Sequence, residues 1–171
     1  MIKLHGLSVS NYSSMVKFAL LEKKIDYEWV ETNPFSLSKD EKILEKTTLG
    51  AVPYLEHDGN FLSETFAIFE FLEKKFPHNR LISEDPIEAS RTVEIMKILE
   101  LYIEHQARPF YPFVFFGAEN TINNIEKPKE VIISGLKAIE KKASLSPFMV
   151  EKFSYADIFA SLTIFALVPV L

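Results

Sequence analysis

The first part of the chain alternates between the hydrophobic period of strands and that of helices. Ile2 and Leu4 alternate with Lys3 and His5, which predicts a short strand. Further strand patterns fall near residues 27–30, 52–56 and 61–62, and helical spacing appears over 15–24 and 68–76. The polar segment 37–46 is predicted to form one short helix on a loop. The predicted order is β-α-β-(α)-β-β-α.

Two apolar runs flank His57-Asp58-Gly59-Asn60, and this is a hairpin signal because Asp-Gly tolerates positive φ. Two strands joined by a helix are expected to be parallel, and the hairpin that follows is antiparallel. Together they imply a small mixed sheet of four strands, covered by helices. Pro77 stops the helix that follows.

From Pro86 onward only helical patterns appear. A long helix is predicted over 87–107, which Pro109 and Pro112 kink or end, and another over 126–143. Ser154 and Asp157 have the spacing of a capping box before a last helix. We therefore expect an α/β domain at 1–77, a polar linker at 78–85 and an all-α domain at 86–171. So few elements after the capping box indicate a helical domain that is C-terminally incomplete or unusually short.

Composition narrows the classes of function. The 171 residues have a net charge of −5 and no clustered basic face, so nucleic-acid binding is not expected. Cysteine is absent, which excludes disulfides and any mechanism that uses a protein thiol. The four histidines show no metal-ligand spacing. No signal peptide and no apolar run of membrane-spanning length is evident, so we expect a soluble cytoplasmic protein.

The chain resembles the glutathione S-transferases from Met1 to about Ala166. The matching residues are Val52-Pro53, Asp58-Gly59, Glu64-Thr65 before Ile68, and the segment Phe153–Ile158. The resemblance implies a thioredoxin-like N-terminal domain, an all-helical C-terminal domain and glutathione as co-substrate. Because cysteine is absent, the chain is similar to the serine- or tyrosine-type members, with a bacterial-like character, and not to the cysteine-type ones.

In this family the proline of the Val-Pro pair follows a cis peptide bond. The resemblance implies that Pro53 does the same, and that the N–H and C=O of Val52 pair with the cysteinyl backbone of glutathione. An isolated Val-Pro has a simpler interpretation, in which Pro53 only begins an edge strand.

Glu64 and Thr65 begin the helix that ends at Pro77, where unpaired N–H groups favour a carboxylate. The resemblance assigns them to the γ-glutamyl end of glutathione: Thr65 binds its carboxylate and Glu64 accepts from its ammonium. The structural alternative is that Ser63 caps the helix and Glu64 complements its dipole.

The chemistry requires a thiolate that the ligand supplies. A free thiol titrates near pH 8.5, and lowering its pKa by about two units needs roughly 2.7 kcal/mol of preference for the anion. A hydroxyl donor at a helix N-terminus supplies such a preference. The polar loop 8–14 offers several hydroxyls: Ser10 lies where serine-type relatives have their activating serine, Tyr12 is the second candidate, and Ser8 and Ser13 follow. Alternatively, these residues only shape and cap the loop.

Two further assignments concern the ends of the substrates. Many relatives have Lys where this chain has Ala51, so we expect Lys39, or another cation of the loop around it, to hold the glycyl carboxylate. The aromatic segment 108–116 either lines a site for a small hydrophobic electrophile or packs in the core, and core packing is the simpler interpretation.

The predicted function is glutathione conjugation to an electrophile, as in detoxification, by a cytoplasmic homodimer; the dimer is implied by the resemblance alone. Two alternatives are a glutathione-dependent isomerase and a non-catalytic module with the same fold. No metal, nucleic acid or membrane partner is expected.

Overall fold

The computed structural model describes residues 1–119, 125–145 and 147–170. The chain divides into two compact units, Met1–Leu81 and Ile82–Leu171. The division falls inside segment 78–85, which the sequence analysis assigns to a linker. Residues 78–81 pack with the first unit, for reasons given in the Discussion.

The first unit contains a four-stranded mixed sheet of order β2-β1-β3-β4. Its strands are β1 (Ile2–Gly6), β2 (Tyr27–Glu31), β3 (Tyr54–His57) and β4 (Asn60–Ser63). Strand β1 runs parallel to β2 and antiparallel to β3, and β3 runs antiparallel to β4. The mixed sheet predicted from the hydrophobic pattern is confirmed.

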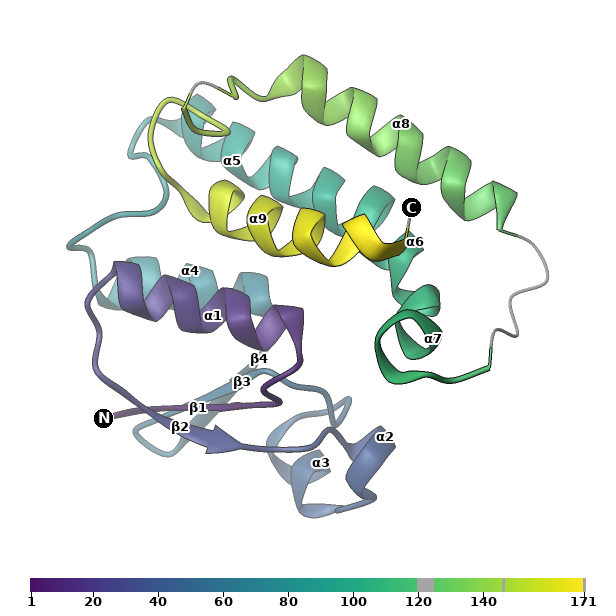
Figure 1. The fold of residues 1–171 in the computed structure, drawn as a ribbon. Helices are drawn as coiled ribbons and strands as arrows, with labels where there is room; N and C mark the ends of the chain where they lie inside the picture. The colour runs from purple at the N-terminus through teal and green to yellow at the C-terminus, as the bar shows by residue number, and fades with distance from the viewer. Residues whose placement is uncertain (120–124, 146, 171) are drawn as a thin grey trace. The chain divides into compact units, whose positions relative to one another are not determined.

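Helices cover both faces of this sheet (Figure 1). Helices α1 (Asn11–Glu22) and α4 (Thr65–Lys75) lie on one face, and the short helices α2 (Phe35–Ser38) and α3 (Lys42–Lys46) lie on the other. The core between the sheet and the two longer helices is mainly apolar, and its most buried members include Leu4, Leu20, Leu55, Ile68 and Leu72. This core holds the ends of the strands, and therefore the loops of the candidate site, in fixed positions.

The hairpin turn is the two-residue turn that the sequence predicts. Asp58 and Gly59 both have positive φ, at 49° and 77°, as the favoured hairpin turn requires. Because His57 pairs directly with Asn60, the arms are longer than the apolar runs alone indicate.

The prediction of one helix over 37–46 is wrong, because two short helices occupy this region. Lys39 ends α2 in the left-handed region, at φ 57°. The Asp40 carboxylate then accepts a hydrogen bond of 3.0 Å from the Lys42 N–H, and the chain turns into α3. This local break moves Lys39 to the end of a helix.

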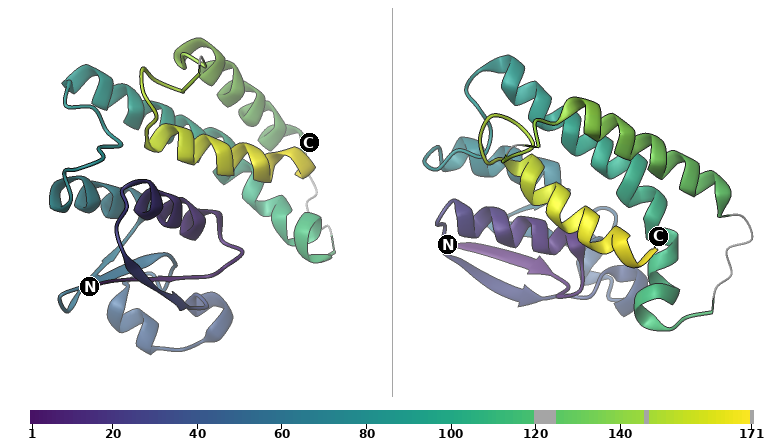
Figure 2. Two further views of the ribbon diagram at one scale, coloured as in Figure 1. Left: turned by 60° about the vertical axis from the view of Figure 1, so that its left-hand side comes forward. Right: turned by 45° about the horizontal axis from the view of Figure 1, so that its top comes forward.

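Within its described residues the second unit contains helices and no strands, as predicted. Helices α5, α8 and α9 lie side by side (Figure 2). The elements are α5 (Pro86–Ile98), a π-helical segment (Leu99–Glu104), α6 (His105–Ala107), a 3₁₀ turn (Arg108–Phe110), α7 (Tyr111–Phe116), α8 (Glu126–Lys142), α9 (Tyr155–Leu167) and a second 3₁₀ turn (Val168–Val170). The single helix predicted over 87–107 is thus continuous but changes its winding at Leu99.

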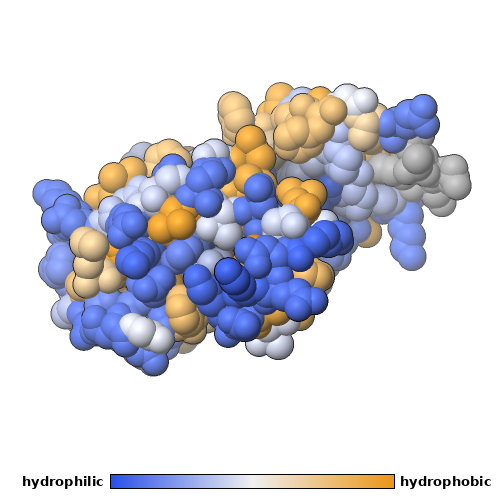
Figure 3. Space-filling model, turned by 90° about the horizontal axis from the view of Figure 1, so that it is seen from below, coloured by the Kyte–Doolittle hydropathy of each residue, from blue (hydrophilic) through white to orange (hydrophobic). Residues whose placement is uncertain are grey.

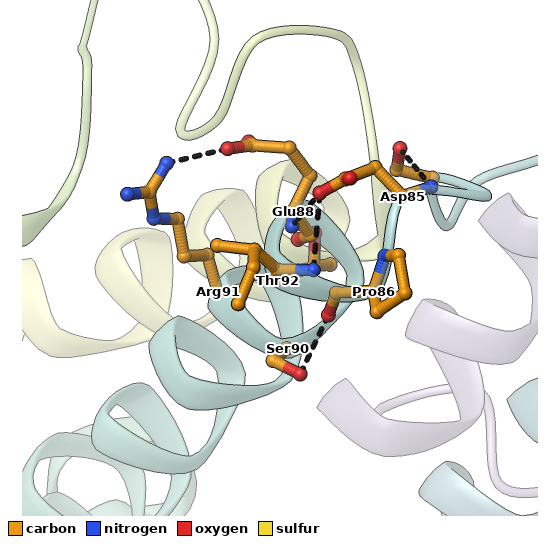
Figure 4. Close-up of polar contacts among 8 residues, drawn as sticks. Asp85, Pro86, Glu88, Ser90, Arg91 and Thr92 are labelled. Atoms are coloured by element: carbon orange, nitrogen blue, oxygen red, sulfur yellow. Dashed lines mark hydrogen bonds and ion pairs between the residues drawn. The ribbon is translucent and has the colours of Figure 1, made fainter.

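Helix α5 begins at a well-formed cap (Figure 4). Asp85 Oδ1 accepts hydrogen bonds from the N–H groups of Ile87 and Glu88, at 3.0 and 2.9 Å. Pro86 occupies the first helical position, where a missing N–H costs nothing. The start of the second unit is therefore set by residues next to one another in the sequence.

The π-helical segment lies against a glycine of α8. A Cβ at Gly135 would lie 2.9 Å from side-chain carbons of both Tyr102 and Ile103. Only glycine permits this close approach without displacing the segment. The change of winding in the long helix is thus coupled to a close contact made by a helix much later in the chain.

On the face shown in Figure 3 hydrophilic residues predominate in the lower part of the view, and apolar residues gather toward its upper right, with others scattered singly. Isolated exposed apolar side chains are normal for globular proteins. Within the described residues, no helix is both long enough and apolar enough to cross a lipid bilayer.

Candidate active site

Strand register brings three of the predicted segments to one end of the sheet. His5 pairs with Tyr54, and Tyr54 pairs with Ser63. The loop that follows β1, the residues that precede β3 and the residues that follow β4 therefore emerge at the same end. These segments contain Ser10, Val52-Pro53 and Glu64-Thr65.

Ser10 is the N-cap residue of α1. Its hydroxyl oxygen accepts a hydrogen bond of 3.3 Å from the Ser13 N–H, and its own N–H donates to the Leu7 carbonyl at 2.9 Å. Within the described part of the chain, no group accepts the hydroxyl hydrogen of Ser10. The side chain therefore caps the helix and keeps a donor for another acceptor.

The other hydroxyls of the loop have different surroundings. Ser8 donates its hydroxyl to Glu31 at 2.6 Å, and Ser13 is buried, with its hydroxyl accepting from the Leu7 N–H at 3.3 Å. Tyr12 is the second residue of α1 and is half-buried. The loop thus uses two of its serines to fix its shape.

The Val52–Pro53 peptide bond is cis, as the resemblance implies. Pro53 immediately precedes β3, which pairs with both β1 and β4 and is an inner strand, so the interpretation as an edge-strand proline is wrong. Neither the N–H nor the C=O of Val52 has a hydrogen-bond partner among the described residues, and the residue is partly exposed. An extended peptide backbone can pair with such groups.

Glu64 has an unusual backbone conformation at the start of α4. Its φ of 68° and ψ of 121° lie outside the left-handed helical region, where a non-glycine residue is strained. It occupies the N-cap position, and no side chain caps the helix, so the alternative in which Ser63 is the cap is wrong. Thr65 follows as the first helical residue and is buried. Its N–H and hydroxyl have no partner among the described groups.

Lys39 lies at the exposed end of α2. Its Nζ lies 5.4 Å from the centroid of the Phe35 ring. Near it, on the sheet face covered by α2 and α3, is a cavity of about 380 Å³. Lys42 and Lys46 line the cavity together with His5 and Tyr54, whereas Lys39 does not.

His5 is a buried residue of that cavity wall. Its ring stacks on Tyr54 with a centroid distance of 4.3 Å, and Nε2 lies 3.1 Å from Glu56. Burial lowers the pKa of His5, and the hydrogen bond to Glu56 opposes this only in part. The same bond is the largest cause of a lowered pKa at Glu56. In the described ranges, no three His, Asp or Glu side chains gather closely enough to hold a metal ion.

The aromatic segment 108–116 divides between packing and surface. Phe110 is buried, whereas Phe115 and Phe116 are exposed. Tyr111 donates to Glu104, a fully buried carboxylate that also accepts from Arg108. Core packing, the simpler of the two interpretations, accounts for Phe110 and in part for the half-buried Phe113, whose ring lies against that of Phe110.

Glu31, which was not among the residues predicted from the sequence, lies at the end of β2 and shapes the loop of Ser10. It accepts from the N–H and hydroxyl of Ser8 and from the indole N–H of Trp29. Hydrogen bonds from Ser8 are the largest causes of a lowered pKa at Glu31. A final acidic residue in a strand gives no signal by itself, because the partner is known only when β1 and β2 are paired.

The fold and the sequence both lead to one class of proteins, those with a thioredoxin-like unit followed by a helical one. The profile described as "Glutathione S-transferase, N-terminal domain" matches residues 4–80. A glutathione S-transferase of Pseudomonas putida is 37% identical over 159 residues, covering 92% of this chain and 71% of that protein. The maleylacetoacetate isomerase of Mus musculus is 30% identical over 144 residues, or 81% of this chain and 63% of that protein.

Among solved structures, a glutathione S-transferase from Pseudomonas fluorescens aligns with a TM-score of 0.85. The alignment covers 99% of this chain and 85% of that one at 23% identity, and it supports the fold. The chain belongs to the glutathione S-transferase family. The resemblance stated from the sequence is thereby confirmed at the level of the family.

Proposed function

We propose that this protein is a glutathione transferase that binds glutathione at the shared end of its sheet and activates the thiol with the hydroxyl of Ser10. The observation that carries the assignment is the Ser10 hydroxyl, which accepts a capping bond from Ser13 and keeps its hydrogen for an acceptor outside the protein. A thiolate sulfur is such an acceptor. The thiol proton goes to solvent, because serine is too weak a base to take it.

Helix geometry adds to this preference for an anion. Ser10 lies at the N-terminus of α1, where unpaired N–H groups and the helix dipole favour negative charge. The Ser8 hydroxyl already donates to Glu31, and Ser13 is buried, which makes Ser10 the better donor of the three. The chain has no cysteine, so the chemistry is of the hydroxyl type. Tyr12 is the alternative donor.

The remaining parts of glutathione have complementary groups nearby. We assign the cysteinyl backbone to the N–H and C=O of Val52, beside Pro53. The γ-glutamyl carboxylate goes to the N–H and hydroxyl of Thr65, and its ammonium goes to Glu64. The glycyl carboxylate goes to Lys39 or Lys42, two of the three lysines of the α2–α3 segment. These assignments give each charged group of the ligand a partner of opposite charge or hydrogen-bond donors, and they pair its central peptide groups with the backbone of Val52.

The reaction proposed is nucleophilic attack of the thiolate on an electrophilic carbon of a small hydrophobic substrate, with formation of a carbon–sulfur bond. The similarity to the glutathione S-transferase of Pseudomonas putida, at 37% identity, supports a conjugation reaction more strongly than an isomerisation. We further propose that the protein acts in the cytoplasm as a homodimer, which light scattering of the purified chain tests by its mass.

The test is the ultraviolet absorbance of glutathione thiolate against pH in the presence of the protein. We expect a midpoint well below that of free glutathione. Ser10→Gly removes the hydroxyl at a cost of only a few tenths of a kcal/mol in capping, and its midpoint is expected to rise. Ser10→Thr keeps both roles and is expected to restore the low midpoint. Ser14→Ala is the matched control in the next turn of the helix.

Other outcomes assign activation of the thiol to another side chain or argue against it. A low midpoint that Ser10→Gly leaves unchanged and Tyr12→Phe raises makes Tyr12 the donor. A wild-type protein that binds to a glutathione resin but does not lower the midpoint of the thiolate titration argues against thiol activation. A wild-type protein that also fails to bind the glutathione resin is best explained as a non-catalytic module with this fold.

A further inference from the structure

The loop that presents Ser10 is attached to the neighbouring strand through one carboxylate. Glu31 Oε1 accepts from the Ser8 N–H at 2.9 Å, and Glu31 Oε2 accepts from the Ser8 hydroxyl at 2.6 Å. The indole N–H of Trp29 donates to the same Oε2 at 2.9 Å. Three donors therefore converge on one side chain at the end of β2. Hydrogen bonds to an ionised acceptor are the stronger kind, even where water competes.

Trp29 is itself held in place by two neighbours. A Cβ at Gly6 would lie 2.6 Å from the Trp29 ring and 2.7 Å from the Ser13 hydroxyl, so the missing side chain admits both. The Lys17 ammonium lies 4.1 Å from the centroid of the Trp29 ring. The donor that Trp29 offers to Glu31 is thus fixed by packing, and the cation beside it offsets part of the carboxylate charge.

On its other side the loop is attached to α1. The Leu7 N–H donates to the Ser13 hydroxyl, and the Leu7 carbonyl accepts from the Ser10 N–H. The turn from Leu7 to Ser10 therefore has helix contacts at both ends and the Glu31 contact at Ser8 between them. Among the described residues, the hydrogen bonds of Ser8 to Glu31 are the ones that hold the middle of the turn.

We propose that Glu31 is a positioning residue for the thiol-activating hydroxyl: by holding both donors of Ser8, it fixes the turn that directs Ser10 toward the glutathione sulfur. This inference rests on the proposed function. Glu31 does not touch the ligand in this account, and it acts through Ser8. The ionised carboxylate is the required form, because only that form accepts from both groups of Ser8 and from Trp29 without donating.

A second physical effect of the same carboxylate has the opposite sign. A negative charge near the sulfur disfavours the thiolate, so removing that charge lowers the thiol pKa if Glu31 acts only as a charge. Removing a positioning contact raises it, because the hydroxyl donor is then misplaced. Ser8→Ala removes the contact and changes no charge, so it separates the two effects.

The experiment compares Glu31→Gln, Ser8→Ala and the double variant in the thiolate titration, with kcat and KM measured for each. We expect the thiolate midpoint to rise in both single variants, and kcat to fall about tenfold with a smaller change in KM. The double variant is expected to resemble the single ones, because both disrupt one contact. Glu28→Gln is the matched control, since Glu28 lies on the same strand and is exposed.

Three results overturn the inference. A midpoint that falls in Glu31→Gln and is unchanged in Ser8→Ala shows a charge effect alone. Fully additive changes in the double variant show that Glu31 does not act through Ser8. Unchanged midpoints in both variants, with a low midpoint in wild type, leave the proposed function intact and remove the role of Glu31. A wild-type protein that does not lower the midpoint contradicts the proposed function itself.

Discussion

Lys23 Nζ donates a hydrogen bond of 2.8 Å to Glu73 Oε1, between two buried side chains of the first unit. The ammonium also donates to the carbonyls of His78 and Asn79, and Glu73 Oε1 accepts from the Leu81 N–H at 3.2 Å. One ion pair thus joins the end of α1, helix α4 and the segment that follows. This is why residues 78–81 pack with the first unit.

Removing one member of this pair leaves a buried charge without its partner. Lys23→Met is therefore expected to lower the free energy of unfolding by about 3–5 kcal/mol. The double variant with Glu73→Met is expected to lose less than Lys23→Met alone, because neither charge remains. Urea unfolding followed by circular dichroism measures both. Lys24→Met, at the exposed neighbouring residue, is the control, and equal stability of Lys23→Met and this control contradicts the prediction.

The start of α9 gives a second stability prediction. Asp157 accepts from the N–H groups of Met149 and Ser154, each at 2.8 Å, while the Ser154 hydroxyl caps the helix through the Ala156 N–H. Ser154→Ala is expected to cost about 1 kcal/mol, the usual value of a lost cap. Asp157→Ala is expected to cost about 2 kcal/mol or more, because bonds to a charged acceptor are lost in both the cap and the preceding loop. Ser161→Ala, on the exposed side of α9, is the control, and thermal unfolding ranks the three.

The first unit also has a predicted pH dependence. Because burial lowers the pKa of His5 below its ordinary value of 6.5, the unfolded chain takes up a proton there before the folded protein does. Stability from this residue is therefore complete above about pH 6.5 and is lost as the pH falls further. Lys46 and Lys3 act in the same direction, and Glu56 opposes them.

The check for His5 is the free energy of unfolding in urea at pH 7.5 and at pH 5.5. We expect the wild-type protein to lose more stability between these values than His5→Phe, which keeps a ring for stacking on Tyr54. Equal losses in the two proteins show that His5 does not contribute to the pH dependence.

Features set by adjacent residues were predictable from the sequence. The Asp58-Gly59 turn and the Ser154–Asp157 capping box depend on neighbours in the chain, and both are confirmed. Features set by tertiary contact were not. The π-helical segment packs closely against Gly135, which is far along the chain, and the break at Lys39 falls at a single left-handed residue in a segment of helical composition.

The same distinction applies to the candidate site. Ser10, Val52-Pro53 and Glu64-Thr65 were named from short motifs, and strand register shows why they meet at one end of the sheet. Glu31 was missed because its three donors come from β1's loop and from Trp29, and only the paired strands bring them together. The interpretation of Ser63 as a helix cap failed because the chain enters α4 through a strained Glu64.

That strain at Glu64 leads to a prediction in which stability and binding change in opposite directions. A non-glycine residue at such φ and ψ costs of the order of 1–3 kcal/mol, whereas glycine adopts positive φ without steric cost. After the larger backbone entropy of glycine is subtracted, Glu64→Gly is expected to raise the free energy of unfolding by about 1 kcal/mol. Asn79→Gly is the matched control: Asn79 has a φ of 48°, in a region that asparagine tolerates, and we expect little change.

Glutathione affinity is expected to fall in the same variant. Glu64→Gly removes the carboxylate assigned to the γ-glutamyl ammonium and also relaxes the backbone that holds Thr65 at the start of α4. Glu64→Gln separates the two, since it keeps the strained backbone and removes only the charge. We expect it to leave stability unchanged and to weaken glutathione binding about tenfold, as measured by calorimetry. A Glu64→Gly protein that is more stable and binds glutathione as tightly as wild type shows that the strain has no part in binding, whereas one that is less stable shows that Glu64 makes contacts in the folded protein worth more than its strain.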